Sequence, residues 1–280
     1  MRKNRIQQKI MIFIMVIIIT AGLIPGGTVA VQAAGDVSNP AIGQISLFPY
    51  NRAPLGWMPC DGRSLSVAQY QSLYNLIGNA FGGNATNFNL PNLSTKAPIT
   101  GTKYYIAVEG LYGIDNSAPA IGEVCLLPDS IVPADSDMWK LCDGTALSST
   151  AYPTLYSLIT TTYGGTATDF KIPNLSTKNP ISGVSYYIAT FGLYPSASGI
   201  GNEPYLGAIE LYAFSFVPQD TINCNGQSIA ISGNQALFSL IGYTFGGSGS
   251  SFAVPNLSYS LPSMKMKYCM RSVGLYPSFD

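Results

Sequence analysis

The chain repeats the same short landmarks three times at a spacing of 82 residues. This spacing separates Cys60, Cys142 and Cys224, each of which precedes an Asp-Gly or Asn-Gly pair. It also separates aromatic-Gly-Gly triplets beginning at residues 81, 163 and 245, Pro-Asn-Leu triplets at 91, 173 and 255, and Gly-Leu-Tyr triplets at 110, 192 and 274. Solenoid repeats have periods of about 20 to 50 residues, so this longer period predicts small domains in tandem. We expect them at residues 41–112, 122–194 and 207–278.

Residues 1–34 differ from the repeats and are typical of a secretory signal peptide. Four basic residues precede an apolar run at residues 10–24, and small residues follow up to Ala34. This pattern predicts cleavage after Ala33 or Ala34. An uncleaved membrane anchor is the alternative, but the apolar run is shorter than the roughly 20 residues that span a bilayer. We expect a secreted mature protein that is not embedded in a membrane.

The charge of the mature chain argues against a nucleic-acid partner. Residues 35–280 hold 10 basic and 14 acidic side chains, which gives a formal charge near −4. Proteins that bind nucleic acids neutralise phosphates with clustered Lys and Arg. Such clusters are missing from residues 35–280.

Each repeat predicts the same short elements. Alternating or apolar residues follow a glycine at residues 43–48, 122–127 and 207–212, and the alternation in the first and third copies indicates a first strand. Residues 64–77 place apolar side chains at helical spacing and predict one amphipathic helix, with counterparts in the other copies. Short strands stopped by proline follow near residue 88 and its equivalents, and a last strand is expected at residues 103–108, 185–190 and 267–272.

The predicted fold class is therefore α+β. It consists of three small β-rich domains in tandem, each with four or five short strands and one helix. Segments rich in Gly, Ser, Pro and Asn at residues 113–121 and 195–206 are expected to be linkers.

The landmarks resemble those of the phage tail collar domain. They read Gly-x-Ile-x-Leu-Phe, Pro-x-Gly-Trp-x-x-Cys-Asp-Gly, a Leu-Tyr-x-Leu-Ile helix, Phe-Gly-Gly and Phe-x-Leu-Pro-Asn-Leu in the first copy. The closing residues 268–278 resemble the last strand of bacterial microcystin-dependent proteins, which carry this domain. The resemblance implies a structural or receptor-binding role and a trimeric habit. Three covalent copies are therefore expected to pack about a pseudo-threefold axis.

The residue inventory argues against an enzyme, a metal site or a cofactor. The chain has no histidine, which removes the commonest general base and metal ligand, including the histidines that hold a metal in some short tail fibres. The aspartate of the Cys-Asp-Gly motif becomes Asn225 in the third copy. Asn and Asp both adopt the tight turn before glycine, but only Asp can act as a base, so the motif predicts a turn. The sequons at Asn84, Asn92, Asn174 and Asn256 are likewise interpreted as turns rather than as glycan sites.

Two interpretations of the five cysteines stay open. An exported protein can form disulfides, and we hypothesise pairs between Cys125 and Cys142 and between Cys224 and Cys269, with Cys60 left over. Alternatively, the shared cysteine is a small buried apolar residue.

Polar loops after the Gly-Gly pairs are the candidate ligand contacts, although solubility explains them equally well. Their polar residues differ between the copies and include Asn84, Asn87, Thr166, Asp169, Ser248 and Ser250. Ser, Gly and Asn beside Tyr form adaptable recognition surfaces. The sequence thus predicts a secreted, non-enzymatic structural or adhesive protein that binds a cell surface, a glycan or itself. The alternative is a subunit of an extracellular filament or a phage-derived tail-like particle.

Overall fold

The computed structural model describes residues 40–114, 119–195, 205–263 and 265–279. The predicted signal peptide and much of both predicted linkers lie outside these residues. Residues 37–280 form one compact unit. Within the described residues, no helix combines the length and the apolar character that crossing a membrane requires.

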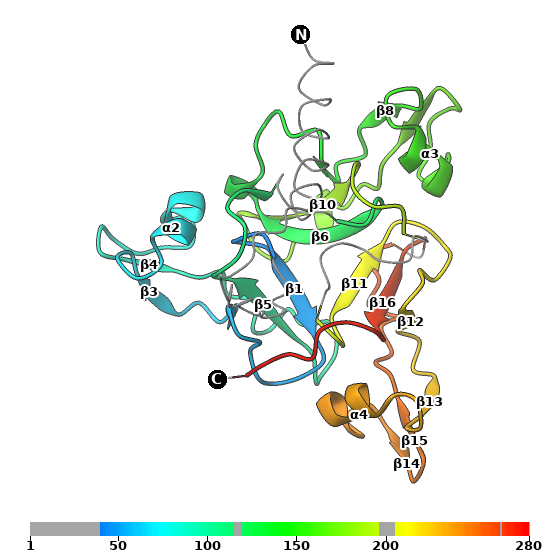
Figure 1. Cartoon of the computed structure of the whole chain (residues 1–280). Helices are drawn as coiled ribbons and strands as arrows, with labels where there is room; N and C mark the ends of the chain where they lie inside the picture. The colour runs from blue at the N-terminus through cyan, green and yellow to red at the C-terminus, as the bar shows by residue number, and fades with distance from the viewer. Residues whose placement is uncertain (1–39, 115–118, 196–204, 264, 280) are drawn as a thin grey trace, which may run out of the picture. The chain divides into compact units, whose positions relative to one another are not determined.

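The three copies share five strands and one helix in the same order, and the second copy adds two 3-10 helices and the third adds β14 (Figure 1). The first copy comprises β1 (Ile45–Phe48), β2 (Trp57–Pro59), β3 (Ser64–Ser66), α2 (Gln71–Ile77), β4 (Asn87–Asn89) and β5 (Lys103–Ala107). The second comprises β6 (Glu123–Pro128), η2 (Asp129–Ile131), β7 (Trp139–Leu141), β8 (Ala146–Ser148), α3 (Pro153–Ile159), β9 (Asp169–Lys171), η3 (Ser176–Lys178) and β10 (Val184–Ala189). The third comprises β11 (Ile209–Tyr212), β12 (Thr221–Asn223), β13 (Ser228–Ala230), α4 (Gln235–Ile241), β14 (Gly247–Ser248), β15 (Ser251–Ala253) and β16 (Lys267–Arg271). The described fold is α+β and mostly β, as predicted.

The predicted helix at residues 64–77 is too long. Its first residues form β3, in which Leu65 pairs with Phe88 of β4, and the helix begins only at Gln71. In β3 the backbone of Leu65 pairs with β4 while its side chain is buried in the core, so this residue is better placed in a strand than in the helix. The helix ends at Gly78, which has a positive φ of 52°.

A small sheet packs against each helix. Ring contacts join the two layers in every copy, with centroids 5.4 Å apart between Tyr74 and Phe88 and 5.3 Å apart between Phe238 and Phe252. Figure 1 shows α2 beside β3 and β4, and α4 beside β13 to β15. These aromatic contacts explain why the tyrosine or phenylalanine at the helix position recurs.

The first strands of the three copies pair with one another in a closed ring. Leu47 of β1 faces Ile209 of β11, and Ile45 of β1 faces Leu126 of β6. Leu211 of β11 faces Val124 of β6, which closes the ring. Each pairing joins the first apolar residue of one strand to the second apolar residue of another, so the three contacts are equivalent. The pseudo-threefold packing predicted from the repeat is confirmed.

Glycines at the start of these strands make a second set of equivalent contacts. Gly122 has a φ of +84°, and an added Cβ would lie 2.9 Å from the Phe214 ring of the third copy. Gly43 meets Ile131 of the second copy in the same way, and Gly207 meets Tyr50 of the first. Glycine is required here because the backbone is left-handed and the neighbouring copy approaches closely.

The aromatic-Gly-Gly landmark supplies a third set. Phe81 of the first copy packs against Gly183 of the second, and Phe245 of the third packs against Gly101 of the first. Tyr163 of the second contacts Lys265 of the third, whose ammonium lies 5.8 Å from the ring centroid. A landmark that recurs along the sequence therefore joins different copies in space.

Candidate functional site

The Cys-Asp-Gly motif forms the same turn in every copy. The side-chain oxygen of Asp61 accepts the backbone N–H two residues later at 3.1 Å, and Asn225 does the same at 3.2 Å. The following glycines have φ values of 79° to 84°. A carboxylate and an amide are interchangeable in this role, so the interpretation of the motif as a turn is confirmed.

The asparagines of the repeated sequons also shape turns. The side-chain oxygen of Asn92 accepts hydrogen bonds from the backbone N–H and the hydroxyl of Ser94, at 3.2 and 2.9 Å. Asn174 makes the same pair of bonds with Ser176. The sequon serine is therefore a partner of its own asparagine.

The predicted ligand loops are exposed, and the structure keeps them apart on three small sheets. The backbone N–H of Asn84 donates to the carbonyl of Asn87 at 2.6 Å, and Thr166 donates to Asp169 at 2.9 Å. Ser248 lies in β14, and Ser250 lies in the turn to β15. These loops hold their own polar groups, and their role in binding stays a prediction.

The five cysteines are free thiols in the structure, so neither hypothesised disulfide is formed there. The partners nevertheless lie in or next to nearby strands of the same sheet: Cys125 and Leu141, the residue before Cys142, flank Tyr187, and Asn223, the residue before Cys224, pairs with Cys269. Burial is the main cause of the raised pKa of the Cys125 and Cys224 thiols. The shared cysteines are also buried, as the alternative interpretation requires. The pairing stays a prediction.

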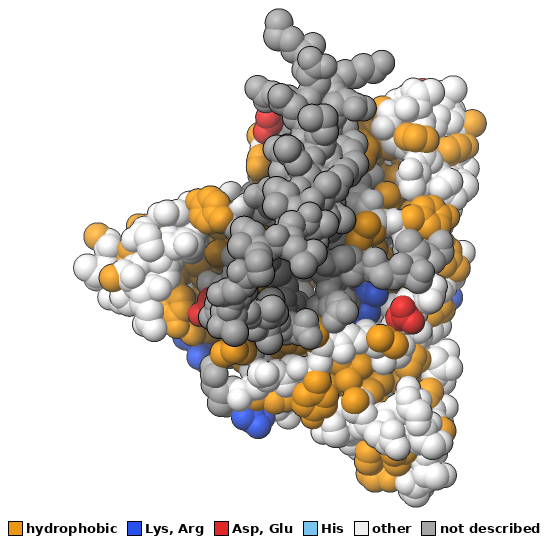
Figure 2. Space-filling model, viewed as in Figure 1, with side chains coloured by type: hydrophobic (Ala, Val, Ile, Leu, Met, Phe, Trp, Pro, Cys, Tyr) orange, Lys and Arg blue, Asp and Glu red, His pale blue; other side chains and the backbone are white. Residues whose placement is uncertain are grey.

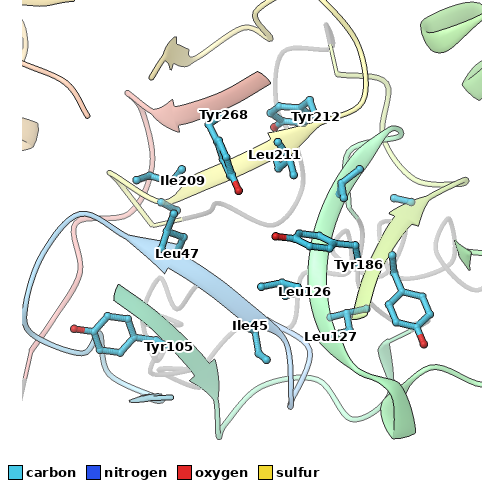
Figure 3. Close-up of a cluster of buried hydrophobic side chains, with 14 of the residues drawn as sticks. Ile45, Leu47, Tyr105, Leu126, Leu127, Tyr186, Ile209, Leu211, Tyr212 and Tyr268 are labelled. Atoms are coloured by element: carbon cyan, nitrogen blue, oxygen red, sulfur yellow. The ribbon is translucent and has the colours of Figure 1, made fainter. Parts of the chain in front are cut away.

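An apolar centre lies between the three first strands (Figure 3). The side chains of Leu47, Leu126 and Leu211 line a cavity of about 40 Å³, and the hydroxyls of Tyr186 and Tyr268 point into the same region. Burial raises the pKa of Tyr186 to about 12, so its phenol stays neutral. Equivalent residues from three copies thus build one small shared centre.

A charged cluster of residues from the second and third copies lies beside this centre. The Arg271 guanidinium contacts both carboxylate oxygens of Glu210 at 2.9 Å. The Tyr212 hydroxyl also donates to Glu210. Glu123 belongs to the same cluster: burial, and then the nearby Glu210 carboxylate, raise its pKa from the usual 4.5 to about 8, while Arg271 opposes the shift.

Sequence reasoning missed this cluster. Glu123, Glu210 and Arg271 belong to different strands and are far apart along the chain. At the positions of Glu210 and Arg271, the first copy has Ser46 and Ala107. A search for charges repeated in all copies therefore passes over them.

The Glu123 side chain has a structural role that its counterpart shares. Its carboxyl oxygen accepts the backbone N–H of Ala120 at 3.2 Å. In the first copy, the amide oxygen of Gln44 accepts the N–H of Ala41 at 3.3 Å. An amide can therefore replace this carboxyl. Among the described residues, no group of three or more acidic or cysteine side chains is placed to hold a metal ion.

Comparison with known families agrees with this repeated architecture. The phage tail collar domain matches the chain three times, at residues 43–98, 122–180 and 207–262. The chain belongs to the phage tail collar domain family. Each match begins at the glycine that contacts a neighbouring copy and runs past the Pro-Asn-Leu landmark. No curated protein and no solved structure shows significant similarity to the chain.

Proposed function

We propose that this collar-domain protein is secreted and non-enzymatic, and that it acts as a structural or adhesive protein that binds a cell surface, a glycan or copies of itself. Family membership indicates a structural role like that of a tail fibre. The surface in Figure 2 carries few charged side chains among polar and apolar ones. Such a surface suits contacts through hydroxyl, amide and aromatic groups.

One observation carries the binding part of the proposal. The tyrosines of the Gly-Leu-Tyr landmark, Tyr112, Tyr194 and Tyr276, recur in every copy, yet they are 53, 42 and 52% exposed. A residue that only filled the core would be buried. Tyrosine supplies a large, rigid contact area at low entropic cost. Three equivalent tyrosines in one chain favour a target that presents repeated groups, because simultaneous contacts strengthen binding.

A binding assay with matched variants tests this proposal. Purified residues 35–280 are applied to a glycan array and to bacterial cells, beside a variant in which the three landmark tyrosines are serine. We expect the variant to lose at least tenfold in apparent affinity. A control variant replaces the 94% exposed Tyr259, which the other copies do not share, by serine and should bind normally. Binding that survives the triple substitution would contradict the proposal.

The second candidate is a subunit of an extracellular filament or a tail-like particle. The central sheet supports it because β12 and β7 end the strand order and leave edges that can pair with another chain. Light scattering after size exclusion separates the candidates. Concentration-dependent polymers favour assembly, and a monomer at all concentrations favours surface binding.

A further inference from the structure

The first copy contains a pocket of about 360 Å³ beside β5 and the cysteine turn. The buried residues Cys60 and Leu93 are part of its lining, and Asp61, Arg63 and Lys103 are its charged lining residues. Its volume lies within the roughly 300 to 1,000 Å³ of small-molecule sites. The loops predicted to bind ligand do not line it.

A single repeat position distinguishes this region from its counterparts. Ala97, which lines the pocket, corresponds to Asn179 in the second copy and to Leu261 in the third. Both replacements are larger, and Leu261 packs against the hydrophobic core. The small alanine therefore leaves space in the first copy that side chains occupy in the others.

In the second copy, the side chain of Asn179 occupies the space that corresponds to the pocket at Ala97. The Asn179 amide nitrogen donates to the Ser185 hydroxyl at 2.9 Å, and its oxygen accepts the Tyr186 N–H at 3.4 Å. The first copy has Lys103 and Tyr104 at the two partner positions, and both line the pocket. Ala97 offers no polar group to either of them.

The second copy has Ser185 where the first has Lys103, and this difference changes the kind of chemical group that the pocket can bind. A serine hydroxyl can accept a hydrogen bond from an amide, whereas a lysine ammonium can only donate. A group between Lys103 and the Tyr104 N–H must accept at both ends, which is what a carboxylate does.

The charges around the pocket agree with an anion. Arg63 is bound to Asp61 through Nε at 2.9 Å and through a terminal nitrogen at 2.6 Å, so these two charges offset each other. No ion pair among the described residues includes Lys103. One positive charge is left for a ligand.

We propose that this pocket binds the carboxylate of an acidic sugar residue, such as a uronic acid. The carboxylate lies between the Lys103 ammonium and the Tyr104 N–H. Asn51, Asp61 and Ser94, which also line the pocket, are polar partners for the sugar hydroxyls. The inference rests on the proposed surface-binding function, because it names the chemical class of one ligand.

The test titrates the purified residues 35–280 with galacturonate, using calorimetry or ligand-observed NMR, and uses galactose as the uncharged comparison. We expect one saturable site for galacturonate and at least tenfold weaker binding of galactose. The double variant Ala97→Asn/Lys103→Ser gives the first copy the residues of the second, and it should lose at least tenfold in affinity. Lys103→Gln alone removes the charge without closing the space and should also weaken binding.

The reverse exchange is the stronger test. Asn179→Ala/Ser185→Lys gives the second copy the residues of the first, and we expect the number of galacturonate sites to rise from one to two. Thermal unfolding of each variant shows that it is folded. The proposal is overturned if galacturonate does not saturate, if galactose binds equally well, or if the closing variant binds normally.

The outcomes also separate this inference from the proposed function. Adhesion to cells without galacturonate binding removes the pocket proposal and leaves the adhesive function. Galacturonate binding without adhesion to any surface removes the adhesive function and leaves the site.

Discussion

Replacing Arg271 by alanine should be among the most destabilising single changes in the described part of the chain. The side chains of Arg271 and Glu210 are 6 and 13% exposed, and Glu123 lies beside them. Arg271→Ala leaves the buried Glu210 carboxylate without a counter-charge, because Glu123, whose pKa is raised to about 8, is mostly neutral near pH 7. Breaking a buried pair in this way costs about 3 to 5 kcal/mol. Both other copies already have alanine at this position, so the backbone accepts it.

The matched control removes both charges together. Glu210→Ser/Arg271→Ala gives the third copy the residues Ser46 and Ala107 of the first. Without a buried charge left over, the cost should fall to about 1 to 2 kcal/mol, which is the lost packing. Glu210→Ser alone should cost about 1 to 3 kcal/mol, because loss of the Glu210 carboxylate lowers the pKa of Glu123, which can then ionise and offset part of the Arg271 charge. The double variant should thus lose at least about 1 kcal/mol less than the sum of the single variants.

Urea unfolding near pH 7 measures these free energies. Fluorescence follows Trp57 and Trp139, which are buried in the first and second copies, and circular dichroism follows all three copies. The slope of the free energy against urea concentration must be equal across the variants for the comparison to hold. The reasoning would be refuted by an Arg271→Ala cost below about 1 kcal/mol, or by a double variant as unstable as the sum of its parts.

Three further predictions concern pH, thiols and ring closure. Because the pKa of Glu123 is raised to about 8, its stabilising protonated state is complete below pH 4.5 and is lost as the pH rises through 8. Glu123→Gln should therefore gain melting temperature relative to the wild type as the pH rises from 5 to 9, and parallel melting curves would contradict this. Burial raises the pKa of the thiols, so the folded protein should react slowly with iodoacetamide. After unfolding, intact mass should show one reactive thiol if the hypothesised disulfides form, and five if they do not. Gly101→Ala should cost about 1 to 2 kcal/mol more than Gly233→Ala. Both glycines have a φ near +90°, but an added Cβ at Gly101 would lie 2.9 Å from Thr244 of the third copy, whereas at Gly233 it would meet nothing within 4 Å. Equal costs of the two substitutions in urea unfolding would refute the contact.

The sequence predicts the elements that every copy repeats. Alternating apolar residues located the first strands, and Gly78 and Gly242 marked the helix ends. The start of the first helix was wrong because Leu65 and its neighbours pair with β4, and helical periodicity does not report that pairing. The short strands that begin at Trp57 and Trp139 were not predicted, since three residues are too few to show alternation.

Contacts between copies were harder to predict than the elements. A repeat shows that the copies are alike, but the pairing register depends on which copy lies beside which. The apolar pattern of the first strands is similar in all three copies and does not distinguish these arrangements. The charged cluster combines residues from β6, β11 and β16, and it has no counterpart in the first copy. The pocket did have a signal in the sequence: alignment of the copies sets Ala97 against Asn179 and Leu261. That signal is a difference between the copies and not a residue that they share.

Covalent linkage of the copies gives this ring a freedom that a homotrimer lacks. In a homotrimer, each substitution appears three times, so a charge near the axis meets its own copies. Here the combination of Arg271, Glu210 and Glu123 occurs once, whereas identical subunits would have to repeat it at all three interfaces. In the same way, one copy can keep Ala97 and an open pocket while the others fill the space. The repeated residues hold the copies together, and the residues that differ are therefore the place to look for specific binding.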